Sequence, residues 1–268
     1  MHSEDEERLN ERKAAMGGLH DPAEHPNIRD AESARRSTEK FLRLSHETGR
    51  PVHILHVSSA DELPLIARAK EDRTGRVSAE VTPQHLYFSA PDCYDRLGTH
   101  AQMNPPIRSA DHRSALWKAF AQGLFDVFGS DHAPHTLEEK AKQYPSSPSG
   151  MPGVQTMLPV LLTFASQGRI SYEDIARMAT ENPSTLFGIR SKGHLAQGYD
   201  ADLVLVDPKR RVEFERKMVA SKCVWSPYEG ETFVGWPVRV ILHGKTAMQE
   251  GEPVAAPSGK ALEYNWKG

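Results

Sequence analysis

The sequence has few cysteines, no long apolar run and no excess of charge of one sign. Only Cys93 and Cys223 occur among 268 residues, so a disulfide framework is not expected and a reducing compartment is the default. No apolar run approaches the ~20 residues of a membrane span, and the charged segment from Glu4 to Lys13 is not a signal peptide. The net charge of −3 indicates no nucleic-acid or membrane partner. We expect a soluble, cytoplasmic protein.

Helices and strands alternate through the first two thirds of the chain, which predicts an α/β fold with a parallel sheet. Short apolar runs predict strands at 51–57, 76–81 and 124–129, and amphipathic patterns predict helices at 30–48, 59–72, 111–122, 157–165 and 172–187. Ser59 to Glu62 and Thr136 to Glu139 have the spacing of capping boxes. Gly188 is expected to follow the end of the last of these helices.

The pattern changes near Gly198, where strands separated by turns replace helices. Residues 202–207, 212–214 and 238–242 are predicted strands, and the intervening glycines and prolines indicate a small β module. We therefore expect two domains, at 1–195 and 196–268. The first contains too few strands for a closed parallel barrel, which needs eight. Either another chain completes the sheet or the sequence is truncated.

Three clusters of polar residues follow the expected strands. Asp131 lies in Gly129–His135 after a buried run, His56 ends the strand that contains His53, and His2 precedes Glu4 and Asp5. Loops at the carboxyl ends of parallel strands commonly carry chemistry. Because side chains alternate along a strand, His53 and His56 are expected to point to opposite faces, and His56 is the better candidate.

Each of these residues also has a purely structural interpretation. A single histidine at a strand end is more often a hydrogen-bonded core residue, and Asp131 is equally well explained as a helix cap or an ion-pair partner. Together, however, two imidazoles and a carboxylate suit zinc. Zinc makes its bound water acidic, and a nearby carboxylate can move the proton to a leaving nitrogen. This equipment suits amide hydrolysis.

The order of the motifs resembles the C-terminal two-thirds of a bacterial dihydroorotase, a cyclic amidohydrolase of the amidohydrolase superfamily. The resemblance runs from His2 to about Gly251 and implies part of a metal-dependent (β/α)8 TIM-like barrel followed by part of a small β-sandwich. The motifs that carry it are His2-Ser3-Glu4-Asp5, His53-Ile54-Leu55-His56-Val57-Ser58, Glu80-Val81-Thr82-Pro83, Met103-Asn104-Pro105-Pro106, Ser130-Asp131-His132-Ala133-Pro134-His135, Pro148-Ser149-Gly150 and Gly198-Tyr199-Asp200-Ala201-Asp202.

The resemblance also implies roles for individual residues. His2 and His56 would bind the second of two zinc ions, and Asp131 would bind the first and act as the catalytic acid and base. Asn104 and His135 would hold the substrate ring and carboxylate, and the loop at Ser149 and Gly150 would contact the substrate through its backbone.

The sequence departs from the family before His2. The His-x-His pair of the first strand and the bridging carboxylate of the fourth are absent, so the chain is expected not to build the two-metal site alone. Other residues have structural interpretations: His85 as a packing residue, Lys140 as a helix-start residue, and Glu4 to Glu7 as a solvated loop.

The expected function is interconversion of dihydroorotate and N-carbamoyl-aspartate in pyrimidine synthesis. An allantoinase or a dihydropyrimidinase would share the same histidines and aspartate, so the ligands do not discriminate. A third alternative is a non-catalytic subunit that supports aspartate transcarbamoylase, although such a subunit has no reason to keep His2, His56 and Asp131. A homodimer is an expectation of the resemblance alone.

Overall fold

The computed structural model describes residues 1–2, 4–18, 21–72, 76–256 and 258–265. Contacts between residues divide the chain into two compact units. Unit 1 contains Met1–Val154 and Ala220–Pro227, and unit 2 contains Gln155–Val219 and Tyr228–Gly268. These contact units and the expected domains are different divisions of the chain, and the domain boundary at residues 195 and 196 stays a prediction.

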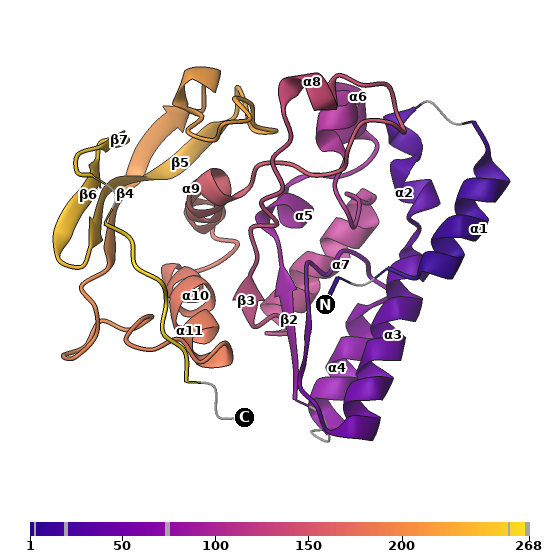
Figure 1. Ribbon diagram of the computed structural model, residues 1–268, viewed down its shortest axis with the longest axis horizontal. Helices are drawn as coiled ribbons and strands as arrows, with labels where there is room; N and C mark the ends of the chain where they lie inside the picture. The colour runs from indigo at the N-terminus through magenta and orange to yellow at the C-terminus, as the bar shows by residue number, and fades with distance from the viewer. Residues whose placement is uncertain (3, 19–20, 73–75, 257, 266–268) are drawn as a thin grey trace. The chain divides into compact units, whose positions relative to one another are not determined.

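Unit 1 is built around a parallel sheet in the order β1-β2-β3, formed by Val52–Ile54, Val77–Val81 and Val127–Phe128 (Figure 1). Parallel neighbours need crossover connections, which helices usually provide. Here α4 (Leu63–Asp72) lies between β1 and β2 in the sequence, and α7 (Ala110–Ala121) lies between β2 and β3. The predicted α/β class is therefore confirmed for this part of the chain.

The longest helix of unit 1, α3 (Ala31–Thr48), matches the predicted span of 30–48. The Asp30 side chain accepts a hydrogen bond from the Ser33 N–H at its start, and Gly49 adopts a left-handed φ of 66° at its end. The helix contacts β1 and α4 and buries Ala34, Thr38 and Leu42. Local capping and an amphipathic face were sufficient to predict this element.

The shorter elements of unit 1 were not all expected. Glu6 and Glu7 form the first turn of α1 (Glu6–Met16), where acidic residues complement the helix dipole, so the expected solvated loop at Glu4 to Glu7 is wrong. The other short helices are α2 (His25–Ile28), α5 (Pro83–Tyr87), α6 (Asp92–Leu97) and α8 (Leu137–Lys140), with 3-10 turns at Pro22–Glu24 and Gly98–Ala101.

The two expected capping boxes differ in outcome. At Thr136 the side chain accepts from the Glu139 N–H and Glu139 accepts from the Thr136 N–H, so this box is confirmed. At Ser59 only half of the pattern forms, because Glu62 accepts from the Ser59 N–H while α4 itself begins at Leu63. Glu62 is instead buried, and it also accepts from the Thr38 hydroxyl.

Unit 2 combines helices with an antiparallel sheet in the order β4-β5-β6-β7. The strands are Leu203–Glu213, Thr232–Leu242, Lys245–Gln249 and Glu252–Pro253. The expected strands at 202–207 and 212–214 are one strand with a register shift between Asp207 and Arg211. The helical segments are α9 (Val154–Ser166), α10 (Tyr172–Ala176), a π-helical turn (Arg177–Glu181), α11 (Asn182–Leu186) and a 3-10 turn (Arg216–Met218).

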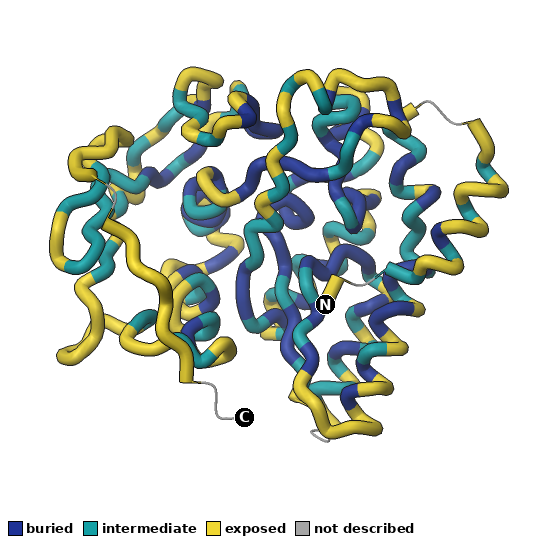
Figure 2. The backbone as a smooth tube through the Cα atoms, in the orientation of Figure 1, coloured by how far each residue is buried: buried dark blue, intermediate teal, exposed yellow. Residues whose placement is uncertain are grey.

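The two sheets differ in burial. Strands β1 to β3 consist mostly of buried residues, whereas most residues of β4 are exposed (Figure 2). Strands buried on both faces are typical of parallel sheets covered by helices. None of the described helices is both long and apolar enough to cross a bilayer.

Candidate active site

A cavity of about 650 Å³ in unit 1 lies at the carboxyl ends of the parallel strands. It brings together residues that are far apart in the sequence but follow β1, β2 and β3 in the fold. Its lining residues are His2, Leu55, His56, Glu80, Asn104, Gly129, Ser130, Asp131, His132, Ala133, Ser149 and Gly150. Six of the seven residues singled out from the sequence therefore line one cavity.

His2 and His56 face each other across this cavity. The Nδ1 atom of His2 lies 3.0 Å from Nε2 of His56, and the two rings meet edge to face. Burial, and next the neighbouring His2, lowers the pKa of His56 to about 3. His56 is therefore neutral at pH 7, which is the form of imidazole that binds metals.

Glu4 orients His2 from the other side of the ring. Its Oε2 atom lies 2.9 Å from Nε2 of His2 and also accepts a hydrogen bond from Arg29. Burial alone would raise the pKa of Glu4, but the His2 hydrogen bond and the Arg29 charge hold it below the usual value. A carboxylate on the distal ring nitrogen fixes the tautomer that points the other nitrogen at a metal.

Glu80 lies near the carboxyl end of β2, the middle strand of the parallel sheet. Its Oε2 accepts from Nε2 of His53 at 3.1 Å, and its Oε1 accepts from the backbone N–H of His56 at 3.1 Å. His53 also contacts the Ser78 hydroxyl through Nδ1 at 2.8 Å. His53 thus contacts Glu80 and Ser78, and His56, the histidine nearer the carboxyl end of the strand, is the one that lines the cavity.

Asp131 follows β3 and is the titratable group best suited to proton transfer. Burial, together with the negative charge of Glu80, raises the pKa of Asp131 to about 6, and His2 opposes this shift. A carboxyl with a pKa near neutrality exchanges protons readily in both directions. The raised pKa of Asp131 and its place in the cavity lining are therefore compatible with an acid and base role.

The backbone is strained at two of these positions. His56 and Asp131 have φ values of 34° and 41°, in a region that residues other than glycine rarely adopt. Such conformations persist where the surrounding structure imposes them, and they concentrate at functional sites. Because β1 ends at Ile54, the turn after the strand, rather than strand alternation, directs His56 toward the cavity.

The expected substrate-binding residues lie on one side of the cavity. Asn104, Ser149 and Gly150 line it, and Asn104 Oδ1 accepts from the buried His25 at 3.0 Å. His135 does not belong to the lining, but its Nε2 donates to the Ser149 carbonyl at 3.2 Å. The structure therefore places His135 behind the loop that lines the cavity.

The donor set at this cavity fits a metal in part. Two nitrogens bound to a tetrahedral zinc at ~2.0–2.1 Å lie roughly 3.3 Å apart, close to the 3.0 Å between His2 and His56. The buried Nδ1 of His56 has no hydrogen-bond partner among the described residues. Asp131 shares the cavity but does not complete a tight three-ligand group with these histidines, as far as the described residues show.

Unit 2 contains such a tight group at Asp200, Asp202 and His243, whose donor atoms lie within 4.8 Å of one another. The Lys192 ammonium already pairs with both carboxylates, at 2.8 Å from Asp200 and at hydrogen-bond distance from Asp202. The lysine therefore supplies the positive charge that a metal would bring. We assign this group to structural stabilisation.

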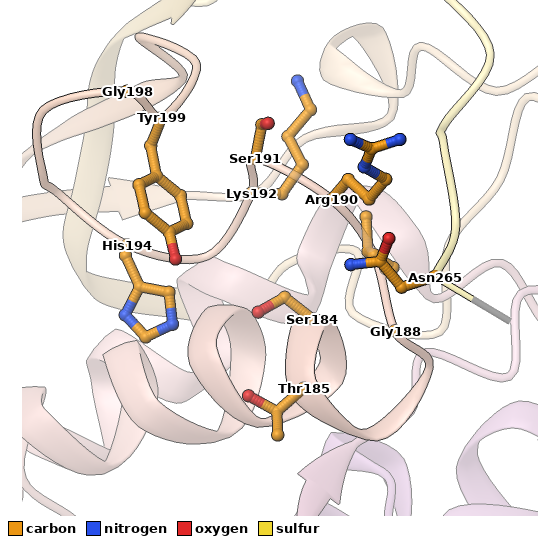
Figure 3. A pocket seen from close by; sticks show the side chains of 11 residues that line it. Ser184, Thr185, Gly188, Arg190, Ser191, Lys192, His194, Gly198, Tyr199 and Asn265 are labelled. Atoms are coloured by element: carbon orange, nitrogen blue, oxygen red, sulfur yellow. The ribbon is translucent and has the colours of Figure 1, made fainter. Parts of the chain in front are cut away.

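A second cavity in unit 2, of about 480 Å³, is also polar but offers no catalytic set. Figure 3 shows side chains around it from α11 and the following loop. Its cations are already paired, Arg190 with Glu263 at 3.5 Å and Lys192 with the aspartates. The ring of His194 contacts that of Tyr199.

Sequence patterns assigned no role to several residues of the unit 1 site. Glu80, like Asp131, is an acidic residue near the end of an apolar strand, and this feature could have indicated a role. Glu4 could have been identified because it lies two positions after the candidate ligand His2. His132 lines the cavity, and its Nδ1 accepts from the Gly153 N–H at 3.1 Å.

His85 is buried between Thr82 and the Pro105 carbonyl, a packing position. Lys140 is the last residue of α8, not a helix-start residue, and is wholly buried.

A family model described as the amidohydrolase family matches residues 17–247. The chain belongs to the amidohydrolase family. It is 38% identical over 260 residues to a dihydroorotase of Halobacterium salinarum, covering 97% of this chain and 59% of that protein. A dihydroorotase of Methanothermobacter thermautotrophicus is 36% identical over 232 residues, covering 87% of this chain and 52% of the relative.

Among solved structures, an L-hydantoinase (dihydropyrimidinase) from Arthrobacter aurescens superimposes with a TM-score of 0.89 at 31% identity. The match covers 95% of this chain and 57% of that one. A D-hydantoinase structure gives a TM-score of 0.87 at 29% identity, covering 94% and 57%. The chain thus spans between about half and three fifths of the length of these relatives.

Proposed function

We propose that this chain carries the catalytic aspartate and the second-metal histidines of a dihydroorotase, which interconverts dihydroorotate and N-carbamoyl-L-aspartate. The observation that carries the proposal is the cavity in which the His2 and His56 nitrogens face each other beside Asp131, whose pKa is raised to about 6. The similarity to dihydroorotases over 97% of the chain supports this substrate class.

In this proposal, β1, β2 and β3 are strands of a (β/α)8 barrel, and His2 follows another strand of it. The antiparallel sheet of unit 2 belongs to a small β-sandwich. The parallel topology and the position of the cavity at the carboxyl ends of the strands support the barrel assignment. The match to hydantoinase structures with a TM-score of 0.89 supports it further.

His2 and His56 would hold one zinc ion, and Asp131 would bind another. When bound, zinc increases the acidity of water and polarises the ring carbonyl. Glu4 holds His2 in the tautomer needed for binding, and Glu80 holds the His56 backbone. Asp131 accepts a proton from the attacking water and returns it to the ring nitrogen as the C–N bond breaks, so its starting protonation state is regenerated.

The remaining cavity residues would orient the substrate. Asn104, Ser149 and Gly150 line the cavity, and the Ser149 N–H, which donates to no described residue, is suited to a ring carbonyl. His135 does not line the cavity, so we assign it a supporting contact through the Ser149 carbonyl, and the carboxylate-binding role that the resemblance implies stays a prediction. Association with aspartate transcarbamoylase and homodimerisation rest on the family resemblance.

A hydantoinase or dihydropyrimidinase activity is the second candidate. The TM-scores of 0.89 and 0.87 to hydantoinases favour it, because these folds hold a similar cyclic ureide. Dihydroorotate differs from those rings by a carboxylate, so a cationic or donor group near the ring decides between the two. His135 is the family's candidate for that group, but here its Nε2 donates to the Ser149 carbonyl outside the cavity lining, so the preference for dihydroorotate rests on the similarity to dihydroorotases.

The deciding experiment compares turnover of dihydroorotate, dihydrouracil, hydantoin and allantoin by a zinc-loaded protein in which this chain is joined to a segment that carries the family's first-strand histidines and bridging carboxylate. We expect a preference for dihydroorotate, with product absent in the Asp131→Asn variant. The exposed Asp95→Asn variant is the matched control for expression and purity. Faster turnover of hydantoin or dihydrouracil would transfer the assignment to the second candidate, and turnover that persists in Asp131→Asn would remove Asp131 from the reaction.

A further inference from the structure

Lys140 is a buried cation that the proposed reaction does not use. Its side chain has no exposed surface, and no carboxylate of a described residue pairs with it. Its Nζ donates to the carbonyls of Pro148 and Gly150, at 2.8 and 3.2 Å. Burying an ammonium without a carboxylate is unfavourable, and here hydrogen bonds to the two carbonyls compensate for part of that cost.

The two carbonyls that Lys140 contacts flank Ser149 in the cavity wall. The Ser149 carbonyl accepts from His135, and the Gly150 N–H donates to the Gln102 carbonyl at 2.8 Å. Gly150 has a φ of 139°, and a Cβ there would lie 2.5 Å from the Ala133 carbonyl oxygen. Three successive carbonyls of this loop are therefore held in place, two of them by one ammonium.

Trp225 completes the arrangement on the far side of Lys140. The ammonium lies 5.7 Å from the centre of a Trp225 ring, a distance at which a cation is attracted to the ring face. The indole N–H donates to the His135 carbonyl at 2.7 Å. Lys140 and Trp225 thus connect the loop at 148–150 with the loop that follows Asp131.

We propose that Lys140, supported by Trp225, is a positioning residue that fixes the backbone of Ser149 and Gly150 for ligand binding. The Ser149 N–H donates to no described residue, so the fixed loop keeps this donor available to a ligand. Naming that ligand as a cyclic ureide rests on the proposed function, whereas the effect of Lys140 on the loop does not.

The test compares Lys140→Met, which keeps the unbranched stem and removes the ammonium, with Lys70→Met as a matched control. Lys70 donates to the Leu124 carbonyl and pairs with Asp126, away from the cavity lining. The first readout is hydrogen exchange at the Gly150 amide. We expect exchange about tenfold faster in Lys140→Met, and in Lys70→Met no change beyond that caused by lower global stability.

The second readout is kinetic. For dihydroorotate we expect KM to rise about tenfold in Lys140→Met while kcat changes by less than about threefold, because the loop binds the ring without taking part in proton transfer. A Gly150 amide that exchanges as slowly as in the wild type would overturn the proposal, as would a KM equal to that of Lys70→Met.

A third measurement needs no variant. In the wild-type protein, Nζ of Lys140 should give a nitrogen-15 signal whose protons exchange slowly, since two carbonyls and the indole exclude water. Rapid exchange there would overturn the proposal even if Lys140→Met does not fold. If the protein hydrolyses none of the ureides, the proposed function fails, and both exchange experiments still decide the role of Lys140.

Discussion

The carboxylate of Glu80 occupies the space that a side chain on Gly129 would need. A Cβ at Gly129 would lie 2.3 Å from Oε1 of Glu80, closer than real Cβ contacts allow. The same oxygen accepts from the His56 N–H, and the Glu80 charge contributes to the raised pKa of Asp131. Glycine at position 129 therefore leaves the space in which Glu80 contacts the His56 backbone and lies close enough to act on Asp131.

Substitution of this glycine should disturb the site more than the fold. We expect Gly129→Ala to displace Glu80 and to lower turnover by one to two orders of magnitude, roughly the effect of a 1 Å displacement at a catalytic site. The measurement is kcat/KM together with the melting temperature. Gly259→Ala, at a glycine where a Cβ would meet no heavy atom within 4 Å, is the control and should change neither. Unchanged turnover in Gly129→Ala would show that the position of Glu80 is unimportant.

Glu4 should act on metal affinity through His2. Removing its negative charge in Glu4→Gln weakens the orienting contact to Nε2 of His2 and leaves the Arg29 charge partly unbalanced. We expect zinc affinity to fall by about 10–100-fold, the usual effect of losing such a carboxylate. Competition with a chelating dye measures it. Glu6→Gln, at an exposed position on α1, should bind zinc as the wild type does.

Asp131 should make the metal-free protein less stable as pH rises. Its folded pKa of about 6 lies above the ordinary value of 3.8, so the folded state holds the proton more tightly. Its stabilising contribution is present below about pH 4 and is lost as pH rises through 6, by at most roughly 3 kcal/mol. Asp131→Asn should therefore gain stability relative to the wild type between pH 4 and 7 in chelator-treated samples. Parallel urea-unfolding curves across this range would contradict the assignment.

Three buried histidines should make the protein less stable as pH falls, the opposite of the effect of Asp131. Burial lowers the pKa of His25 and His85 to about 4 and that of His56 to about 3, so all three are neutral in the folded protein. Their stabilising contribution is present above about pH 6.5 and is lost as pH falls below it, by up to roughly 1.4 kcal/mol per pH unit for each histidine.

Urea unfolding between pH 7.5 and 6 isolates this effect, because Asp131 contributes most of its change at lower pH. We expect the free energy of unfolding to decrease as pH falls over that interval, and to decrease less steeply in His85→Gln. This variant removes one of the three histidines, and His85 does not line the cavity. Identical slopes in the two proteins would show that folding leaves the pKa of His85 near its ordinary value and would contradict the lowered pKa.

The site could be predicted from the sequence to the extent that it follows strand ends. His56 and Asp131 come directly after apolar runs, and parallel strands bring their carboxyl ends to one edge of the sheet. The sequence was therefore enough to predict that the two residues share a cavity. His2, Asn104, Ser149 and Gly150 came from the order of the family motifs. Glu80 also lies near a strand end, but its motif supported only the family resemblance and gave no sign of its contacts with His53 and His56.

The sequence by itself determined the elements whose signals are local. The cap at Asp30, the capping box at Thr136 and the alternation of strands with amphipathic helices depend on neighbours within a few residues. Only the tertiary structure decided the state of Lys140, Glu4 and Glu80. Glu4 and Glu80 contact partners more than 20 residues away, and Lys140 contacts a loop beyond the end of its own helix. A sequence pattern does not report the exclusion of water that strengthens such contacts.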